Sequence, residues 1–171
     1  MMRSILLLSL MALPRFAPSP SVVAADREIW LYVIRFVTTA AEQVPDSSYS
    51  YRPTPTVRTF GQLIAHIAGS QDMFCAQALG EKANDSDLIE KTTTGKAALV
   101  AALKTSTAHC EKAYAISDAE AMKRTVKTFT GERSALWALM FNAVHNNEHY
   151  GNIVTYMRML GMVPPSSQPA H

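Results

Sequence analysis

The sequence lacks the features that mark specialised classes of protein. It has only two cysteines, 7 glycines and 9 prolines in 171 residues, and we find no internal repeat or low-complexity tract. These counts exclude a disulfide-dense scaffold, a collagen-like chain and a disordered linker. With 48% hydrophobic and 18% charged residues, the composition is that of one ordinary globular domain.

No apolar run is long enough to cross a bilayer, which takes about 20 residues. The longest candidate, Ile5–Leu13, has nine. Arg3 precedes this run, and the small residues Val23-Ala24-Ala25 follow it, which is the layout of a secretory signal peptide. We therefore predict a signal peptide at residues 1–25, an exported (periplasmic or secreted) protein, and a folded domain at 26–171. The alternative is an N-terminal arm that stays with the domain.

An excess of either charge is also absent once the predicted signal peptide is set aside. The formal charge of +2 comes from Arg3 and Arg15, because residues 1–25 contain no acidic residue. The remaining chain has 14 basic and 14 acidic residues. Without a basic stripe we expect no nucleic-acid partner and no attraction to anionic membranes after signal cleavage.

Strand-like alternation never extends beyond a few residues, so the sequence predicts an all-α protein. Apolar residues recur at helical spacing in four segments, which makes a four-helix bundle the expected fold. Thr59 and Gln62 form a capping-box pattern at one helix start, and Gly80 and Gly161 stand where C-terminal glycines end helices. The predicted helices are about 26–44, 59–80, 95–116 and 132–160.

The two cysteines, Cys75 and Cys110, fall on consecutive predicted helices. If those helices are antiparallel around the polar connection 81–94, the residue level with Cys75 lies near position 100. Cys110 would then be about 15 Å away along the axis, too far for a disulfide. The sequence therefore predicts two small buried side chains without a bond between them.

Histidines supply the main chemical signal. His145 and His149 are four residues apart, so both rings leave the same face of a helix and can reach one ion. Their stripe also carries Asn142 and Asn152 within an apolar helix, and buried polar groups need partners. His66 in the second helix is the candidate third ligand. Three imidazoles from two helices would form an open site suited to Zn, Ni, Co or Fe(II).

Plainer interpretations of these histidines remain open. The His145/His149 pair is also typical of a solvated helix face or the edge of a core, and a lone His66 is typical of a hydrogen-bonded core residue. We expect His109 to be exposed and His171 to be terminal and disordered.

His145-Asn-Asn-Glu148-His149 also matches the H-x-x-E-H pattern of inverzincin peptidases, in which Glu148 would be the general base. That class takes a later acidic residue as its third ligand. No Asp or Glu follows His149 in this chain, so a third ligand has to come from upstream. The peptidase interpretation is therefore disfavoured, and Glu148 remains a weak catalytic candidate, as a base or as a group that orients a ligand.

Two segments resemble the DinB/YfiT-like family of helical-bundle proteins. They are TVRTFGQLIAHIAGSQDMFCAQALG at 56–80 and HNNEHYGNIVTYMRMLGMVPPSS at 145–167. The resemblance extends over about 28–165. It implies a four-helix bundle with a histidine triad at His66, His145 and His149 that holds a divalent ion, nickel or zinc. It also implies relatives that are transferases and isomerases acting with low-molecular-weight thiols, a small-molecule substrate, and homodimers as a common form.

Three functions follow as hypotheses. The first is a metal-dependent transferase or hydrolase, in which the open position of the ion activates a thiol or a water. The second is a non-catalytic, metal-stabilised bundle that acts as a binding module. The third is a plain bundle without a metal.

Overall fold

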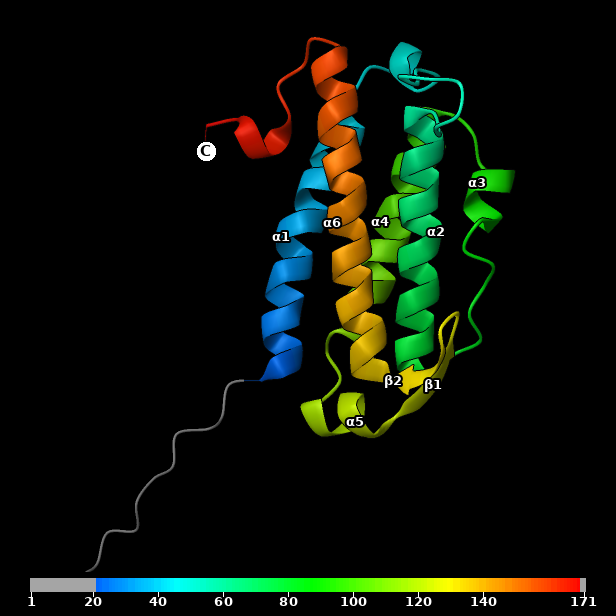
Figure 1. Ribbon diagram of the computed structural model, residues 1–171, viewed down its shortest axis with the longest axis vertical. Coiled ribbons are helices and arrows are strands. Elements are labelled where there is room, and N and C mark those ends of the chain that lie inside the picture. Colours follow the sequence, from blue (N-terminus) through cyan, green and yellow to red (C-terminus); the bar gives the residue numbers. More distant parts are fainter. Residues whose placement is uncertain (1–20, 170–171) are drawn as a thin grey trace, which may run out of the picture.

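The computed structural model describes residues 21–169, and within that range the chain is a four-helix bundle. Figure 1 shows the four long helices packed side by side, with shorter elements at the two ends and along one edge. The predicted all-α bundle is confirmed. The long helices are α1 Val22–Gln43, α2 Phe60–Leu79, α4 Lys96–Ala113 and α6 Ala135–Met159; the short elements are η1 Asp46–Ser48, α3 Leu88–Thr92, α5 Asp118–Lys123, β1 Thr125–Thr128, β2 Gly131–Ser134 and η2 Pro165–Ser167.

Local signals place most helix ends correctly. Thr59 caps α2 through its hydroxyl, and Gln62 returns a hydrogen bond to the Thr59 amide, so the predicted capping box is present. Gly80 and Gly161 both have φ of 75°, the left-handed conformation that ends a helix and that suits glycine.

Helix α1 starts four residues earlier than predicted. Ser21 caps it, and Asp118 of α5 accepts hydrogen bonds from the Ser21 hydroxyl and from the amides of Val22 and Val23. The predicted boundary between residues 25 and 26 therefore falls inside a helix. The apolar run of the predicted signal peptide lies outside the described residues, as does His171, and both predictions stay untested.

Helices α2 and α4 run parallel, which the sequence did not indicate. The chain leaves the lower end of α2, passes α3, and returns to the upper end before α4 begins (Figure 1). Equivalent positions therefore stay level: Gln71 donates to the Ser106 hydroxyl at 2.6 Å. Helices α1 and α6 run in the opposite direction. They contact each other, and α6 also packs on α2 while α1 packs on α4, as a closed four-helix ring requires.

The prediction that Cys75 and Cys110 are unpaired is wrong. They form a disulfide with their Cα atoms 5.1 Å apart, and both side chains are fully buried. The error came from assuming an antiparallel pair. With α2 and α4 parallel, Cys110 is level with Cys75, and the bond joins the two helices within the core.

The returning segment 80–95 lies directly against α2. A Cβ on Gly69 would stand 2.0 Å from the carbonyl oxygen of Ser86, so only glycine at this position permits the close approach. Gly69 follows His66 by one helical turn. The approach therefore carries α3 alongside the turn of α2 that bears His66.

The sequence predicted only a connection between the helices at 95–116 and 132–160, and this is wrong. Strands β1 and β2 form an antiparallel hairpin in which Thr125 pairs with Ser134 and Thr128 with Gly131. Four-residue strands are too short to show a clear alternation in the sequence. Helix α6 consequently begins at Ala135, with Ser134 as its cap, rather than at Glu132.

The core is otherwise as the periodicity predicts, with one exception on α1. Ile29 shares the apolar helical spacing of its segment, yet its side chain is 59% exposed. The buried stripe of α1 instead runs through Asp26, Trp30, Val33 and Val37, and Trp30 stacks on Tyr114 at 4.6 Å between ring centroids. Within residues 21–169, no helix combines the length and the hydropathy needed to cross a bilayer.

Asp26 is a buried acid in this stripe, and it provides a test of the fold. Burial raises the pKa of Asp26 to about 6, and its Oδ2 has no hydrogen-bond partner within residues 21–169. Because the folded state then holds the proton more tightly than the unfolded state, stability falls as the pH rises from about 4 to about 6. In protein that retains residues 21–25, we expect Asp26→Asn to add about 2–3 kcal/mol of stability at pH 8. Urea unfolding at pH 8 and at pH 3.5 measures this, and a gain that is equal at both pH values would contradict it.

Candidate metal centre

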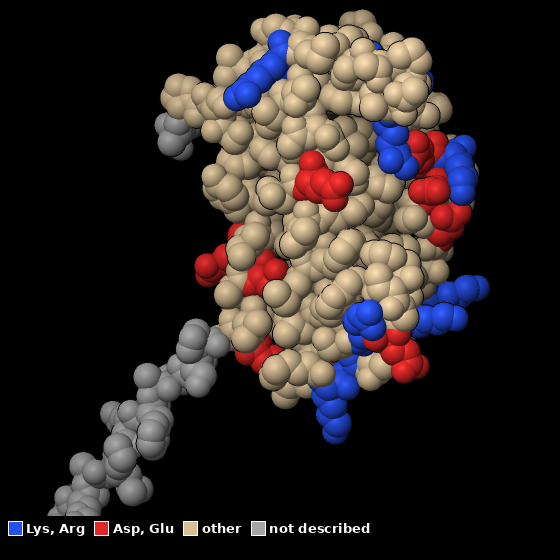
Figure 2. Space-filling model, in the orientation of Figure 1, with Lys and Arg blue, Asp and Glu red and all other residues tan. Residues whose placement is uncertain are grey.

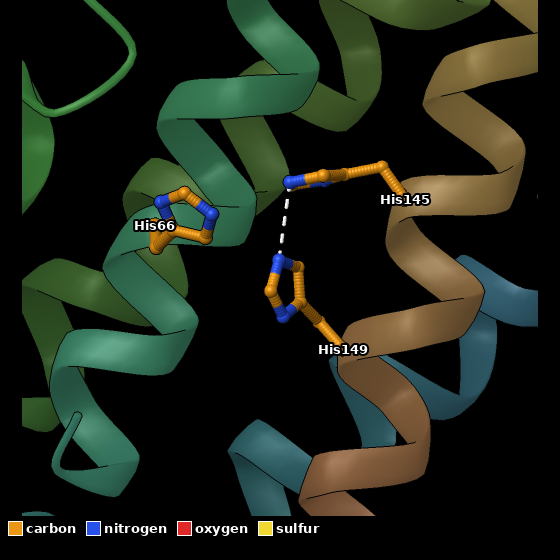
Figure 3. A group of neighbouring side chains, drawn as sticks. All are labelled: His66, His145 and His149. Atoms are coloured by element: carbon orange, nitrogen blue, oxygen red, sulfur yellow. Dashed lines mark hydrogen bonds between the residues drawn. The ribbon is translucent and has the colours of Figure 1, made fainter. Parts of the chain in front are cut away.

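The three predicted histidines lie between two neighbouring helices. His66 is in the second turn of α2, and His145 and His149 are on successive turns of α6. Figure 3 shows the three rings directed into the space between the helices, with a ring nitrogen of His66 on the side of the other two. Residues 79 positions apart in the sequence therefore meet at one point of the bundle.

The spacing of the rings is suited to a common ion. One nitrogen from each ring can be chosen so that all three lie within 4.8 Å of one another. The Nε2 atoms of His145 and His149 are 3.1 Å apart, and the ring centroid of His66 is 5.1 and 4.8 Å from those of His145 and His149. Zn–N bonds of 2.0–2.1 Å place ligand nitrogens roughly 3.3–3.4 Å apart in a tetrahedral site, close to the separation of the His145 and His149 nitrogens.

Each of these rings is neutral at physiological pH. Burial, and secondarily the charge of Arg58, lowers the pKa of His66 to about 4; burial and the neighbouring histidines lower the pKa of His145 to about 3. Burial also lowers the pKa of His149, against an opposing effect of Glu148. Neutral imidazole is the form that binds a metal, so no proton has to be displaced first.

The hydrogen bonding of the triad is incomplete without a further group. His66 Nδ1 and His145 Nδ1 are buried, and neither has a partner within residues 21–169. The Nε2 atoms of His145 and His149 face each other with room for one proton between them. One ring therefore donates this hydrogen bond and the other accepts it. A cation that takes the Nε2 lone pairs of both rings would remove the need for this shared proton, and the donor set thus fits a divalent metal ion.

The returning segment supplies two carboxylates that the sequence analysis missed. Asp87 Oδ1 and Glu90 Oε2 lie 3.9 and 4.0 Å from His66 Nδ1. These distances are longer than a hydrogen bond, but the carboxylates stand on the side of the ring where a carboxylate commonly orients a metal-binding histidine. The only signal in the sequence was a pair of acids within a polar connection.

His66, Asp87 and Glu90 also satisfy the spacing of a metal-ligand group by themselves. Their charges, however, are already balanced by cationic side chains. Glu90 accepts from Arg58 Nε at 3.0 and 3.3 Å, and Lys91 Nζ lies 3.8 Å from Asp87. We therefore treat the carboxylates as supports of the histidine triad.

An apolar wall closes one side of the triad. Phe74 and Phe141 lie 5.7 and 6.3 Å from the His145 ring, and Trp137 stacks on Phe141. Phe129, at the tip of the hairpin, packs against Phe141 at 5.3 Å. This cluster keeps water from His145 on that side.

On the opposite side, a hollow of about 500 Å³ opens beside His149. Access to the triad is therefore from this side. Tyr156 donates from its hydroxyl to the Arg58 carbonyl at 2.7 Å, which ties the loop before α2 to α6. The hollow is lined by Thr56, Val57, Arg58, Leu63, Glu90, His149, Asn152 and Tyr156.

The comparisons with known proteins agree with this architecture. A family model described as DinB superfamily matches residues 34–153, which is most of the chain and includes all three histidines. The chain belongs to the DinB superfamily. A search of curated proteins finds no match to this sequence.

Solved structures share the DinB fold at low sequence identity. A DinB-like protein from Bacillus cereus has a TM-score of 0.72 at 16% identity, covering 85% of this chain and 96% of its own. One from Bacillus subtilis has a TM-score of 0.66 at 22% identity, covering 85% and 99%. A mycothiol-dependent maleylpyruvate isomerase has a TM-score of 0.62 at 16% identity, covering 81% of this chain and 67% of its own. At these identities the likeness establishes the fold.

Two other predicted positions in this DinB bundle lie outside the triad. Glu148 is exposed and does not line the hollow, although its charge is felt by His149. His109 was expected to be exposed, but its side chain is only 21% exposed, and its two ring nitrogens contact Asp72 at 2.7 Å and Glu81 at 2.9 Å. These hydrogen bonds raise the pKa of His109 against the effect of burial, and the contact with Asp72 joins α4 to α2.

Two buried amides explain the polar stripe of α6. Asn146 donates to Gln71 at 3.3 Å, and Asn142 donates to the Tyr114 hydroxyl at 3.3 Å. Both asparagines are fully buried one turn or less from His145. They fix α6 against α2 and α4, and so determine the rotation at which the two histidines leave the helix.

Proposed function

We propose that this DinB protein binds one divalent metal ion, Zn²⁺ or Ni²⁺, through His66, His145 and His149, and uses it in a transferase or hydrolase reaction on a small molecule. The observation that carries the proposal is the convergence of three neutral imidazoles beside an accessible hollow. Three nitrogen ligands leave a coordination position open, as in catalytic zinc sites.

A bound divalent ion would supply Lewis-acid chemistry and would lower the pKa of a bound water or thiol. The protein's own residues orient and shield. Asp87 and Glu90 face His66 Nδ1 at 3.9 and 4.0 Å, and Asn152 lies 3.4 Å from His149 Nδ1 and orients that ring. Phe74 and Phe141 exclude water from His145, whereas the hollow admits the substrate.

The likeness to a mycothiol-dependent isomerase favours a thiol as the activated group over water. Glu148 remains a weak candidate for a base because it is exposed and does not line the hollow. The second candidate function is a non-catalytic bundle whose ion joins α2 to α6. It is favoured by the tight contact of these helices around the triad.

Chelation of protein purified without a histidine tag separates the two functions. Adding Zn²⁺ or Ni²⁺ to the stripped protein at 100 times its Kd should stabilise it by about 2.7 kcal/mol, seen as a higher Tm. For a catalyst, the loaded protein also conjugates a small thiol to an electrophile, and His145→Ala abolishes this turnover. Stabilisation without turnover supports the binding module. If the protein takes up no metal and gains no stability, both functions are contradicted.

Export and self-association belong to the same proposal. A buried disulfide is typical of oxidising compartments, so Cys75–Cys110 supports a periplasmic or secreted protein, as does the signal-like N-terminal sequence. A homodimer is proposed on the family resemblance alone.

A further inference from the structure

We infer that Arg58 is the recognition group for an acidic substrate: a small molecule with one donor atom for the metal ion and a carboxylate, or a similar anion, for the guanidinium. The inference rests on the proposed metal function and specifies the substrate class of the same site. It comes from the way Arg58 is held at the hollow.

Arg58 is anchored in a way that leaves its outer nitrogens available. Only Nε is used by Glu90, at 3.0 and 3.3 Å. Neither Nη group makes a hydrogen bond to any residue between 21 and 169. A guanidinium fixed at Nε presents its two Nη groups as a fork, and this geometry matches a carboxylate bidentately.

The anchor also places this fork beside the triad. The same Glu90 oxygen lies 3.0 Å from Arg58 Nε and 4.0 Å from His66 Nδ1, so one carboxylate separates the guanidinium from the first histidine. Arg58, His149 and Asn152 line the same hollow. A ligand of a few carbon atoms can therefore reach both the open metal position and Arg58.

The charge balance favours an anion. Three neutral imidazoles leave the full charge on a divalent ion, and Arg58 adds one positive charge against Glu90 and Asp87. Figure 2 shows basic and acidic side chains together along the edge where α3 lies, whereas the face over α6 carries few charges. Among the described residues that line the hollow, Arg58 is the only basic one.

Binding to cobalt-loaded protein tests the inference through a spectrum instead of activity. The probes are mercaptocarboxylates with two, three and four carbons, each paired with the mercaptoalcohol of equal length. The thiolate-to-cobalt absorption band reports binding. For at least one length, we expect the carboxylate to bind roughly tenfold more tightly than the alcohol. Arg58→Gln should remove this preference, so that the acid and the alcohol of that length bind with equal affinity.

Arg158→Gln is the matched control, because Arg158 is an exposed arginine of α6 that does not line the hollow. It should keep the preference. Equal affinities for acid and alcohol at every length, or an unchanged preference in Arg58→Gln, would overturn the inference while leaving the metal site intact. Failure of cobalt to bind the wild type would overturn the proposed function itself.

Discussion

Replacing His66 with alanine will reduce the bound zinc or nickel from about one ion per chain to a small fraction of that. His66 is the one ligand that comes from α2, so without it the ion keeps only the two adjacent histidines of α6. Residues that merely orient a ligand change metal affinity 10–100-fold, so loss of the ligand itself should cost more than about 100-fold. Elemental analysis of tag-free protein, dialysed against a weak chelator, measures this.

His109→Ala is the control, because it removes an imidazole that pairs with Asp72 and Glu81 and lies outside the triad. It should retain one ion per chain. Equal metal in the wild type and in His66→Ala would show that His66 is not a ligand. Circular dichroism of both variants separates loss of a ligand from loss of the fold.

Removing the disulfide will produce the second large effect. The bond closes a loop with a sequence separation of 35, and the entropy of that closure corresponds to about 3–4 kcal/mol. We expect the double variant Cys75→Ala, Cys110→Ala to lose about this much free energy of unfolding. Guanidinium denaturation at neutral pH measures it.

Wild-type protein unfolded in the presence of a reductant is the matched comparison and should show a similar loss. Both forms should still bind metal when folded, because the cysteines are not ligands of the triad. A double variant that unfolds at the same denaturant concentration as the oxidised wild type would show that the parallel pairing of α2 and α4 contributes little through this bond.

The helices were predictable because their signals are local. The capping box at Thr59, the glycines that end α2 and α6, and the buried stripe of α2 all act within one or two turns. The direction of α4 was not predictable from such signals. A polar connection of 14 residues can form a loop between antiparallel helices or return along the whole helix. Gly69, which admits the Ser86 backbone, was the only local sign of the return.

The same missing connection concealed part of the candidate site. His145 and His149 could be paired from their spacing alone, and His66 could be added as a histidine on a second helix. Asp87, Glu90 and the exposed fork of Arg58 depend on where the returning segment lies, which is a tertiary property. The low pKa values of His66 and His145 likewise arise from burial in the assembled bundle.

X-ray absorption spectroscopy at the metal edge of zinc- or nickel-loaded wild-type protein tests the central claim most directly, because it counts the imidazoles around the ion. Three histidine nitrogens at about 2.0–2.1 Å, with water completing the shell, are the expected result. A shell of carboxylate oxygens with a single imidazole would instead place the ion among His66, Asp87 and Glu90. It would contradict the claim that the triad holds the metal.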